Sequence, residues 1–164
     1  MKRLTMFFVF ATVFVFNMGL YAQVNDQHYG IHNHHLAIFT GSTSNLEAEY
    51  TDFSIGADYE YRLAYGHNQF GVGLIGEIVF AEHQETIIAL PIFYHPTENF
   101  KFFYAPGFAI AEGEHGESHK AFWSRLGVGY DFHLGNYSIA PGFAADFIEG
   151  NVSLVYGLSF GMGF

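Results

Sequence analysis

The sequence is dominated by segments in which hydrophobic side chains alternate with small or polar ones. The last segment, Asn151–Phe164, is the clearest, because its odd positions are mostly Gly and Ser while its even positions are Val152, Leu154, Tyr156, Leu158, Phe160, Met162 and Phe164. A period of two is typical of a β-strand with one apolar face. The segment is about twice as long as a common strand of a soluble sandwich, and roughly ten tilted residues cross the hydrocarbon of a bilayer.

The same period predicts eight strands joined by short connections that contain Gly, Asn or Pro. The expected strands are Leu36–Ser44, Thr51–Leu63, Phe70–Ala81, Glu85–His95, Phe100–Ile110, His119–Leu134, Tyr137–Phe147 and Asn151–Phe164. The first strand alternates least well. The fourth is apolar on both faces, so its pattern leaves open which face points inward.

Three prolines, Pro91, Pro106 and Pro141, fall within predicted strands. Proline has no N–H group and therefore cannot donate a hydrogen bond to a strand ladder. We expect β-bulges at these positions, assisted by Gly107 and Gly142.

The two faces of the predicted strands differ consistently. One face carries Leu, Ile, Val, Phe and Tyr, and the other carries Gly, Ser and Ala. Ionisable residues also lie on the second face: Asp58, Glu60, Arg62, Glu77, Lys101, Arg125, Asp131 and Asp146. A soluble lipocalin-like barrel has its apolar face inside. The reversed polarity predicts an all-β fold, an eight-stranded antiparallel up-and-down transmembrane β-barrel, apolar towards lipid and polar within.

The interior of an eight-stranded barrel has room only for side chains. The eight ionisable residues are therefore expected to pair with one another and to close the lumen, because an unpaired buried charge is costly. The alternative is a continuous path for water or ions through them. Aromatic residues near one set of strand ends are expected to form an interfacial girdle, namely Tyr59, Tyr61, Tyr94, Phe102, Tyr130, Phe132, Tyr137 and Phe164.

The N-terminus predicts export. Residues 1–22 combine the basic Lys2 and Arg3 with an apolar run and a small residue, Ala22, and so form a signal peptide cleaved after Ala22. Residues 23–35 are a polar lead-in, and residues 36–164 form the barrel domain. With an even number of strands, both ends of the barrel chain are expected on the periplasmic side.

Composition narrows the class further. Only 13% of residues are charged, 20% are aromatic, and there is no Cys. After removal of the signal peptide, four basic residues stand against sixteen acidic ones, a formal charge of −12. Such a surface repels nucleic acid, which we exclude as a partner.

Few residues suggest chemistry. His32, His34 and His35 in the lead-in could together bind Zn²⁺ or Cu²⁺. A catalytic serine and its base are suggested only by the residues Ser118, His119 and Ser124, and no third residue that could orient the base accompanies them at a suitable spacing. We predict no enzymatic activity and no cofactor.

The export signal, the eight alternating segments, the short turns and the terminal Phe164 together resemble the small eight-stranded bacterial outer-membrane β-barrels, the OmpA membrane domain and OmpX among them. The resemblance implies an integral outer-membrane protein, monomeric, inserted by the barrel assembly machinery into outer-membrane lipid and lipopolysaccharide, with a structural or surface-interaction role. A narrow, porin-like pore or solute conduit is one alternative. A secreted, soluble lipocalin-like barrel that binds an apolar ligand is another.

Overall fold

The structure is a computed structural model, and it describes residues 32–47, 50–63, 69–81, 84–112 and 118–164. The predicted signal peptide, its cleavage site after Ala22 and most of the lead-in lie outside these residues. No helix in the described part of the chain is long and apolar enough to cross a membrane.

The described residues form ten strands that pair only in the antiparallel sense. They are β1 (His34–Asn45), β2 (Thr51–Arg62), β3 (Phe70–Phe80), β4 (Glu85–Ala89), β5 (Ile92–Tyr94), β6 (Phe100–Glu112), β7 (Ser118–Tyr130), β8 (Phe132–Leu134), β9 (Tyr137–Ile148) and β10 (Asn151–Gly163). β4 and β5 pair with the same two neighbours, β3 and β6, and so act as one strand. β7 and β8 both pair with β9 and likewise act as one.

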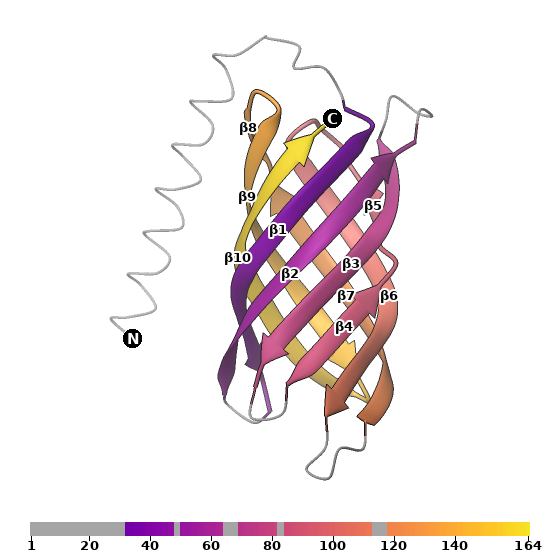
Figure 1. The fold of residues 1–164 in the computed structure, drawn as a ribbon, viewed down its shortest axis with the longest axis vertical. Coiled ribbons are helices and arrows are strands. Elements are labelled where there is room, and N and C mark those ends of the chain that lie inside the picture. Colours follow the sequence, from indigo (N-terminus) through magenta and orange to yellow (C-terminus); the bar gives the residue numbers. More distant parts are fainter. Residues whose placement is uncertain (1–31, 48–49, 64–68, 82–83, 113–117) are drawn as a thin grey trace, which may run out of the picture. The chain divides into compact units, whose positions relative to one another are not determined.

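The sheet closes on itself because β10 pairs with both β9 and β1 (Figure 1). The β1–β10 seam runs from His35 opposite Gly163 to Asn45 opposite Ser153. The prediction of an all-β, eight-stranded antiparallel barrel is therefore confirmed. We call the end where β1 begins and β10 ends the proximal end, and the opposite end the distal end.

Each of the eight predicted segments corresponds to one strand of the barrel, with small shifts at the ends. The largest difference in the first strand is its start, since β1 begins at His34 and thus includes two residues assigned to the lead-in. The pairing of His34 with Tyr61 and of His35 with Glu60 extends the ladder to this point.

The predicted β-bulges are wrong. The register runs without an inserted residue through Pro106 opposite Ser124 and Pro141 opposite Leu158. A proline nitrogen cannot donate to the ladder, but its carbonyl still accepts. The Pro106 carbonyl accepts from Leu90 N–H at 2.9 Å, and the Pro91 carbonyl accepts from Gly73 N–H at 3.0 Å. Because the missing donors of Pro91 and Pro106 affect adjacent positions, the ladder is interrupted between β4 and β5, but its register is not changed.

The apolar face of every strand points outward. On β10, Leu158, Phe160 and Met162 are exposed, whereas Ser153 and Val155 are buried. The predicted girdle aromatics lie towards the proximal end, where Phe100–Tyr130 and Tyr130–Phe132 form edge-to-face pairs at 4.8 and 4.9 Å. The barrel thus has the inverted polarity that the sequence predicts.

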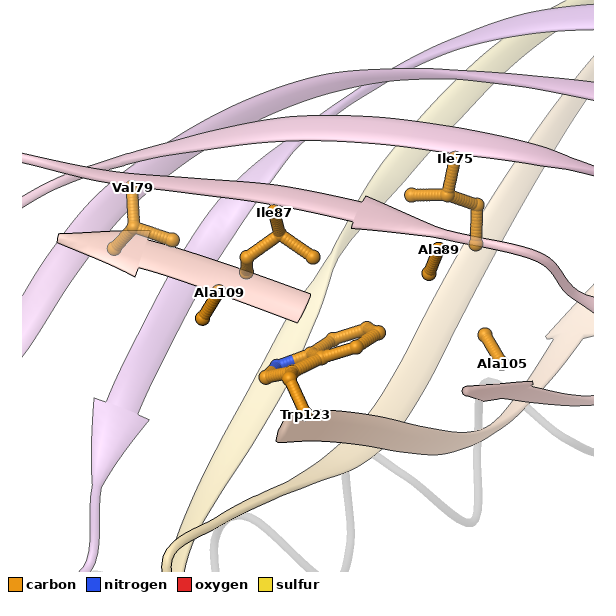
Figure 2. Close-up of a cluster of buried hydrophobic side chains, with 7 residues drawn as sticks. All are labelled: Ile75, Val79, Ile87, Ala89, Ala105, Ala109 and Trp123. Atoms are coloured by element: carbon orange, nitrogen blue, oxygen red, sulfur yellow. The ribbon is translucent and has the colours of Figure 1, made fainter. Parts of the chain in front are cut away.

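The interior is not polar throughout, which corrects that part of the expectation. From the middle of the barrel towards the distal end, seven buried side chains form an apolar plug: Ile75, Val79, Ile87, Ala89, Ala105, Ala109 and Trp123 (Figure 2). The indole ring lies among the small alanines of β4 and β6 (Figure 2). The sequence did not predict the plug because the fourth strand is apolar on both faces, and β4 turns Ile87 and Ala89 inward.

Candidate functional site

Arg125 lies near the middle of β7 and points into the barrel. Its Nε and Nη2 donate to the two carboxylate oxygens of Asp146, at 2.6 and 2.8 Å. Its Nη1 and Nη2 donate to Glu77, at 2.5 and 3.2 Å. Asp146 is directly opposite Arg125 in the β7–β9 ladder, whereas Glu77 comes from β3, which is not a neighbour of β7. One guanidinium therefore connects two separate parts of the barrel wall.

We call Glu77, Arg125 and Asp146 the central triad. All three side chains are buried, and bidentate pairs between Arg and carboxylates are among the strongest hydrogen bonds in proteins. The Arg125 guanidinium also lies 4.9 Å from the Trp123 ring, so the triad rests directly on the apolar plug. One positive charge faces two carboxylates, and the triad carries a formal charge of −1.

A second group of ionisable residues lies closer to the proximal end. Glu60 is at its centre, with its Oε1 2.6 Å from His95 Nε2 and 3.4 Å from Arg62 Nε. Lys101 Nζ and Asp131 Oδ1 form a looser pair, 3.8 Å apart. We call these residues, together with Asp58, the proximal group.

Several buried polar atoms of the proximal half have no hydrogen-bond partner among the described residues: His35 Nδ1, Asp58 Oδ1, Arg62 Nε, His95 Nδ1 and Asp131 Oδ1. Buried polar atoms in proteins are nearly always satisfied by protein groups or by ordered water. The unsatisfied atoms therefore identify places where solvent would be required.

A cavity of about 70 Å³ lies between the central triad and the proximal group. Glu77 and Arg125 line it on one side, and Asp58 and Lys101 on the other. Its remaining wall is largely apolar and includes Phe39, Phe93, Phe103 and Val155. We call this cavity the chamber.

The structure divides the predicted lumen residues into these two groups and does not join them in one continuous network. His95 is a member that the sequence analysis did not include. His95 points inward because it continues the alternation of β5, in which Phe93 is buried and Tyr94 is exposed. The sequence alone does not show which face of this segment points inward, because the segment is apolar on both faces.

The three lead-in histidines do not come together. His34 points outward. Its Nδ1 forms a hydrogen bond of 2.7 Å with the Tyr59 hydroxyl, and its ring stacks on Phe164 with the ring centroids 5.5 Å apart. His35 points inward and lies 3.0 Å from Ser138 Oγ. The His32 ring lies beside Gly163. Among the described residues, no group of three or more His, Asp or Glu side chains is arranged to hold a metal ion.

The residues considered for catalysis are also separate. Ser118 and His119 are consecutive in β7 and so point to opposite faces, and His119 Nε2 lies 3.3 Å from Glu149 Oε1 at the exposed distal end. The buried Ser138–His35 pair lacks a carboxylate on His35 Nδ1, which has no hydrogen-bond partner among the described residues. In the Ser-His-Asp triad a carboxylate on this nitrogen holds the imidazole in its tautomer and orientation.

A closed eight-stranded barrel with an apolar exterior and ionic groups in its interior is typical of the class of small outer-membrane β-barrels. Solved structures of that class share the fold. The N-terminal β-barrel domain of Pseudomonas aeruginosa OprF matches with a TM-score of 0.57 and 13% identity, over 81% of this chain and 98% of that one. Ail, the attachment invasion locus protein of Yersinia pestis, matches with a TM-score of 0.54 and 14% identity, over 82% of this chain and 100% of that one.

Neisserial surface protein A also matches, with a TM-score of 0.53 and 11% identity, over 80% of this chain and 96% of that one. At these identities the similarity is one of fold. No protein-family model matches the sequence, and no curated protein matches it.

Proposed function

We propose that the protein is an integral outer-membrane barrel with a structural or surface-interaction role, that it has no enzymatic activity, and that interior side chains close its lumen. The single observation that supports closure is the contact of the central triad with the apolar plug. Arg125 holds β3 and β9 carboxylates in the middle of the interior, and Trp123 packs beneath it.

The membrane assignment is supported by the exterior. Large hydrophobic side chains are exposed on every strand, among them Leu74, Ile88, Leu126 and Phe160, and a soluble protein rarely exposes so extensive an apolar surface. Closure of the ladder satisfies the backbone groups that hydrocarbon cannot. Export by the signal peptide with cleavage after Ala22, insertion by the barrel assembly machinery, contact with lipopolysaccharide and a monomeric state are parts of the same proposal.

A surface role is consistent with two of the structural neighbours, one described as an attachment invasion locus protein and the other as a surface protein. At the distal end, consecutive strands are separated in the sequence by only two to five residues. A partner at this end would therefore meet the rim of the barrel as much as its loops.

Planar-bilayer recordings test the closed lumen. The purified protein is expected to give no steady ion conductance. The double variant Trp123→Gly/Arg125→Ala removes the two largest side chains at the closure and is expected to conduct ions. It serves as the positive control, because its conductance shows that the recordings detect inserted barrels. Steady conductance by the unmodified protein would support the narrow-pore alternative instead.

Partition experiments test the soluble alternative. The protein is expected to stay with the detergent phase after phase separation. Recovery in the aqueous phase, with the β-sheet signal intact, would favour a secreted barrel that binds an apolar ligand.

A further inference from the structure

The interior consists of two halves that differ in their content. The distal half holds the apolar plug, in which Trp123, Ile87 and Ala109 are at most 2% exposed. The proximal half holds all five of the buried, unsatisfied polar atoms that the described residues contain, as well as the second ionic group. The central triad separates the two.

The proximal half requires solvent. Five buried polar atoms lack hydrogen-bond partners among the described residues, and one of them, Asp58 Oδ1, belongs to a residue that lines the chamber. The chamber has a volume of about 70 Å³, whereas one buried water needs roughly 10–15 Å³ of such volume. Asp58 and Lys101 both line the chamber. Within the part of the chain that the structure describes, the ion pair of Lys101 is the 3.8 Å contact with Asp131. The remaining Lys101 donors and the Asp58 oxygen are therefore available to water or to a small solute.

The plug in the distal half excludes solvent. No unsatisfied buried polar atom of the described residues lies among the plug side chains, and genuinely apolar spaces stay dry. Any solute that reaches the chamber must therefore enter from the proximal end, where Arg62 keeps 12% of its side chain exposed.

We propose that the proximal half of the barrel is a blind vestibule, filled with water and ending at the central triad, that admits small cations. The proposal depends on the closed lumen proposed above but goes beyond it. The cation preference follows from charge: the central triad and the proximal group together hold five carboxylates against the three positive charges of Arg62, Lys101 and Arg125. The balance stays negative even if His95 carries a proton.

Substituted-cysteine accessibility tests the vestibule directly, because the natural chain has no Cys and each introduced thiol is the only one. Ala140 lines the chamber and Ala109 belongs to the plug, and both are 2% exposed. Ala140→Cys and Ala109→Cys are therefore matched in residue type and in burial, and differ only in the solvent that the proposal assigns to them.

With a small cationic methanethiosulfonate as the probe, Ala140→Cys is expected to react at least ~100-fold faster than Ala109→Cys, because modification of a dry position requires the structure to open. An anionic reagent of the same size is expected to react several-fold more slowly at Ala140→Cys. Retention of the compact, heat-modifiable form on gels checks that each variant is folded.

Equal rates at the two positions would overturn the vestibule, and a faster anionic reagent would overturn its preference for cations. If one variant fails to fold, Ala144→Cys in the chamber and Ala89→Cys in the plug replace the pair. The two proposals fail differently. Slow reaction at both positions with a silent bilayer leaves a closed barrel without a vestibule, whereas fast reaction at both positions together with conductance indicates an open pore.

Discussion

Among single residues, Arg125 has the largest expected effect on stability. Replacement by Met leaves the Glu77 and Asp146 carboxylates buried, adjacent and without a positive charge. Breaking a buried ion pair by removing one partner costs about 3–5 kcal/mol. We expect Arg125→Met to lower the free energy of unfolding by this amount, measured by denaturant titration in lipid vesicles.

The control for this prediction neutralises the partners as well. The triple variant Glu77→Gln/Arg125→Met/Asp146→Asn has no unpaired charge, so it is expected to recover most of the lost stability. A triple variant as unstable as Arg125→Met would show that the guanidinium matters for its packing against Trp123 and not for its charge.

Two glycines of β3 provide a comparison of the interior and exterior faces. A Cβ atom at Gly73 would overlap the backbone carbonyl oxygen of Tyr59 on β2 and approach the Phe93 ring, whereas a Cβ at Gly76 meets nothing within 4 Å. Overpacking of an interior costs about 1–3 kcal/mol. Gly73→Ala should destabilise the barrel by this amount in the same unfolding assay.

Gly76→Ala is the matched control, since it lies three residues away on the same strand and should change stability by no more than about 0.5 kcal/mol. Equal effects of the two substitutions would mean that the β2–β3 ladder can shift to accommodate Gly73→Ala.

At the scale of strands, alternation predicted the number and position of all eight. It also assigned the inward face wherever the two faces differ, as on β2, where Asp58, Glu60 and Arg62 share one face. It could not orient the fourth strand, so the plug residue Ile87 and the Glu60 partner His95 were missed. Which inward residues meet across the lumen, such as Glu77 and Arg125, depends on the stagger of the closed sheet, and a single sequence does not contain this stagger.

Position along a strand decides how much an outward charge costs in a bilayer. Leu126, in the middle of the β7 wall, is 58% exposed, and Leu134, at the proximal end of β8, is 61% exposed. Leu126→Arg should cost about 2–4 kcal/mol and Leu134→Arg about 0–1 kcal/mol, because the penalty falls from the bilayer midplane to the interface. Unfolding from lipid vesicles measures both.

The nearly equal exposure of these two leucines makes the pair a test of the surroundings. In water the two substitutions would have the same small effect. A difference between them requires hydrocarbon around Leu126 and would be absent for a soluble barrel.

For the whole molecule, the dry half of the interior can be observed without any label, because Trp123 is the only Trp in the chain. The ring is 2% exposed within the apolar plug. We expect its fluorescence to be emitted at short wavelength and to be insensitive to iodide or acrylamide added to the water phase.

The double variant Trp123→Phe/Leu134→Trp moves the only indole to the exposed proximal hairpin and should be readily quenched. Strong quenching of Trp123 in the unmodified protein would contradict a sealed distal half. It would equally contradict the blind vestibule, because the central triad that ends the vestibule packs on this residue through Arg125.

The seam between β1 and β10 has a topological consequence. His34 and Phe164 exchange backbone hydrogen bonds of 3.3 and 2.9 Å, and the ladder continues from them to Asn45 and Ser153. Each of the eight strands of the barrel, counting β4 with β5 and β7 with β8 as one strand each, therefore has two partners, and the seam is a ladder like those between the other strands. A circularly permuted chain, opened at the hairpin between Leu134 and Tyr137 and joined across His34 and Phe164, would keep the same set of paired strands. The pairing of the strands in the closed barrel therefore does not depend on where the polypeptide starts.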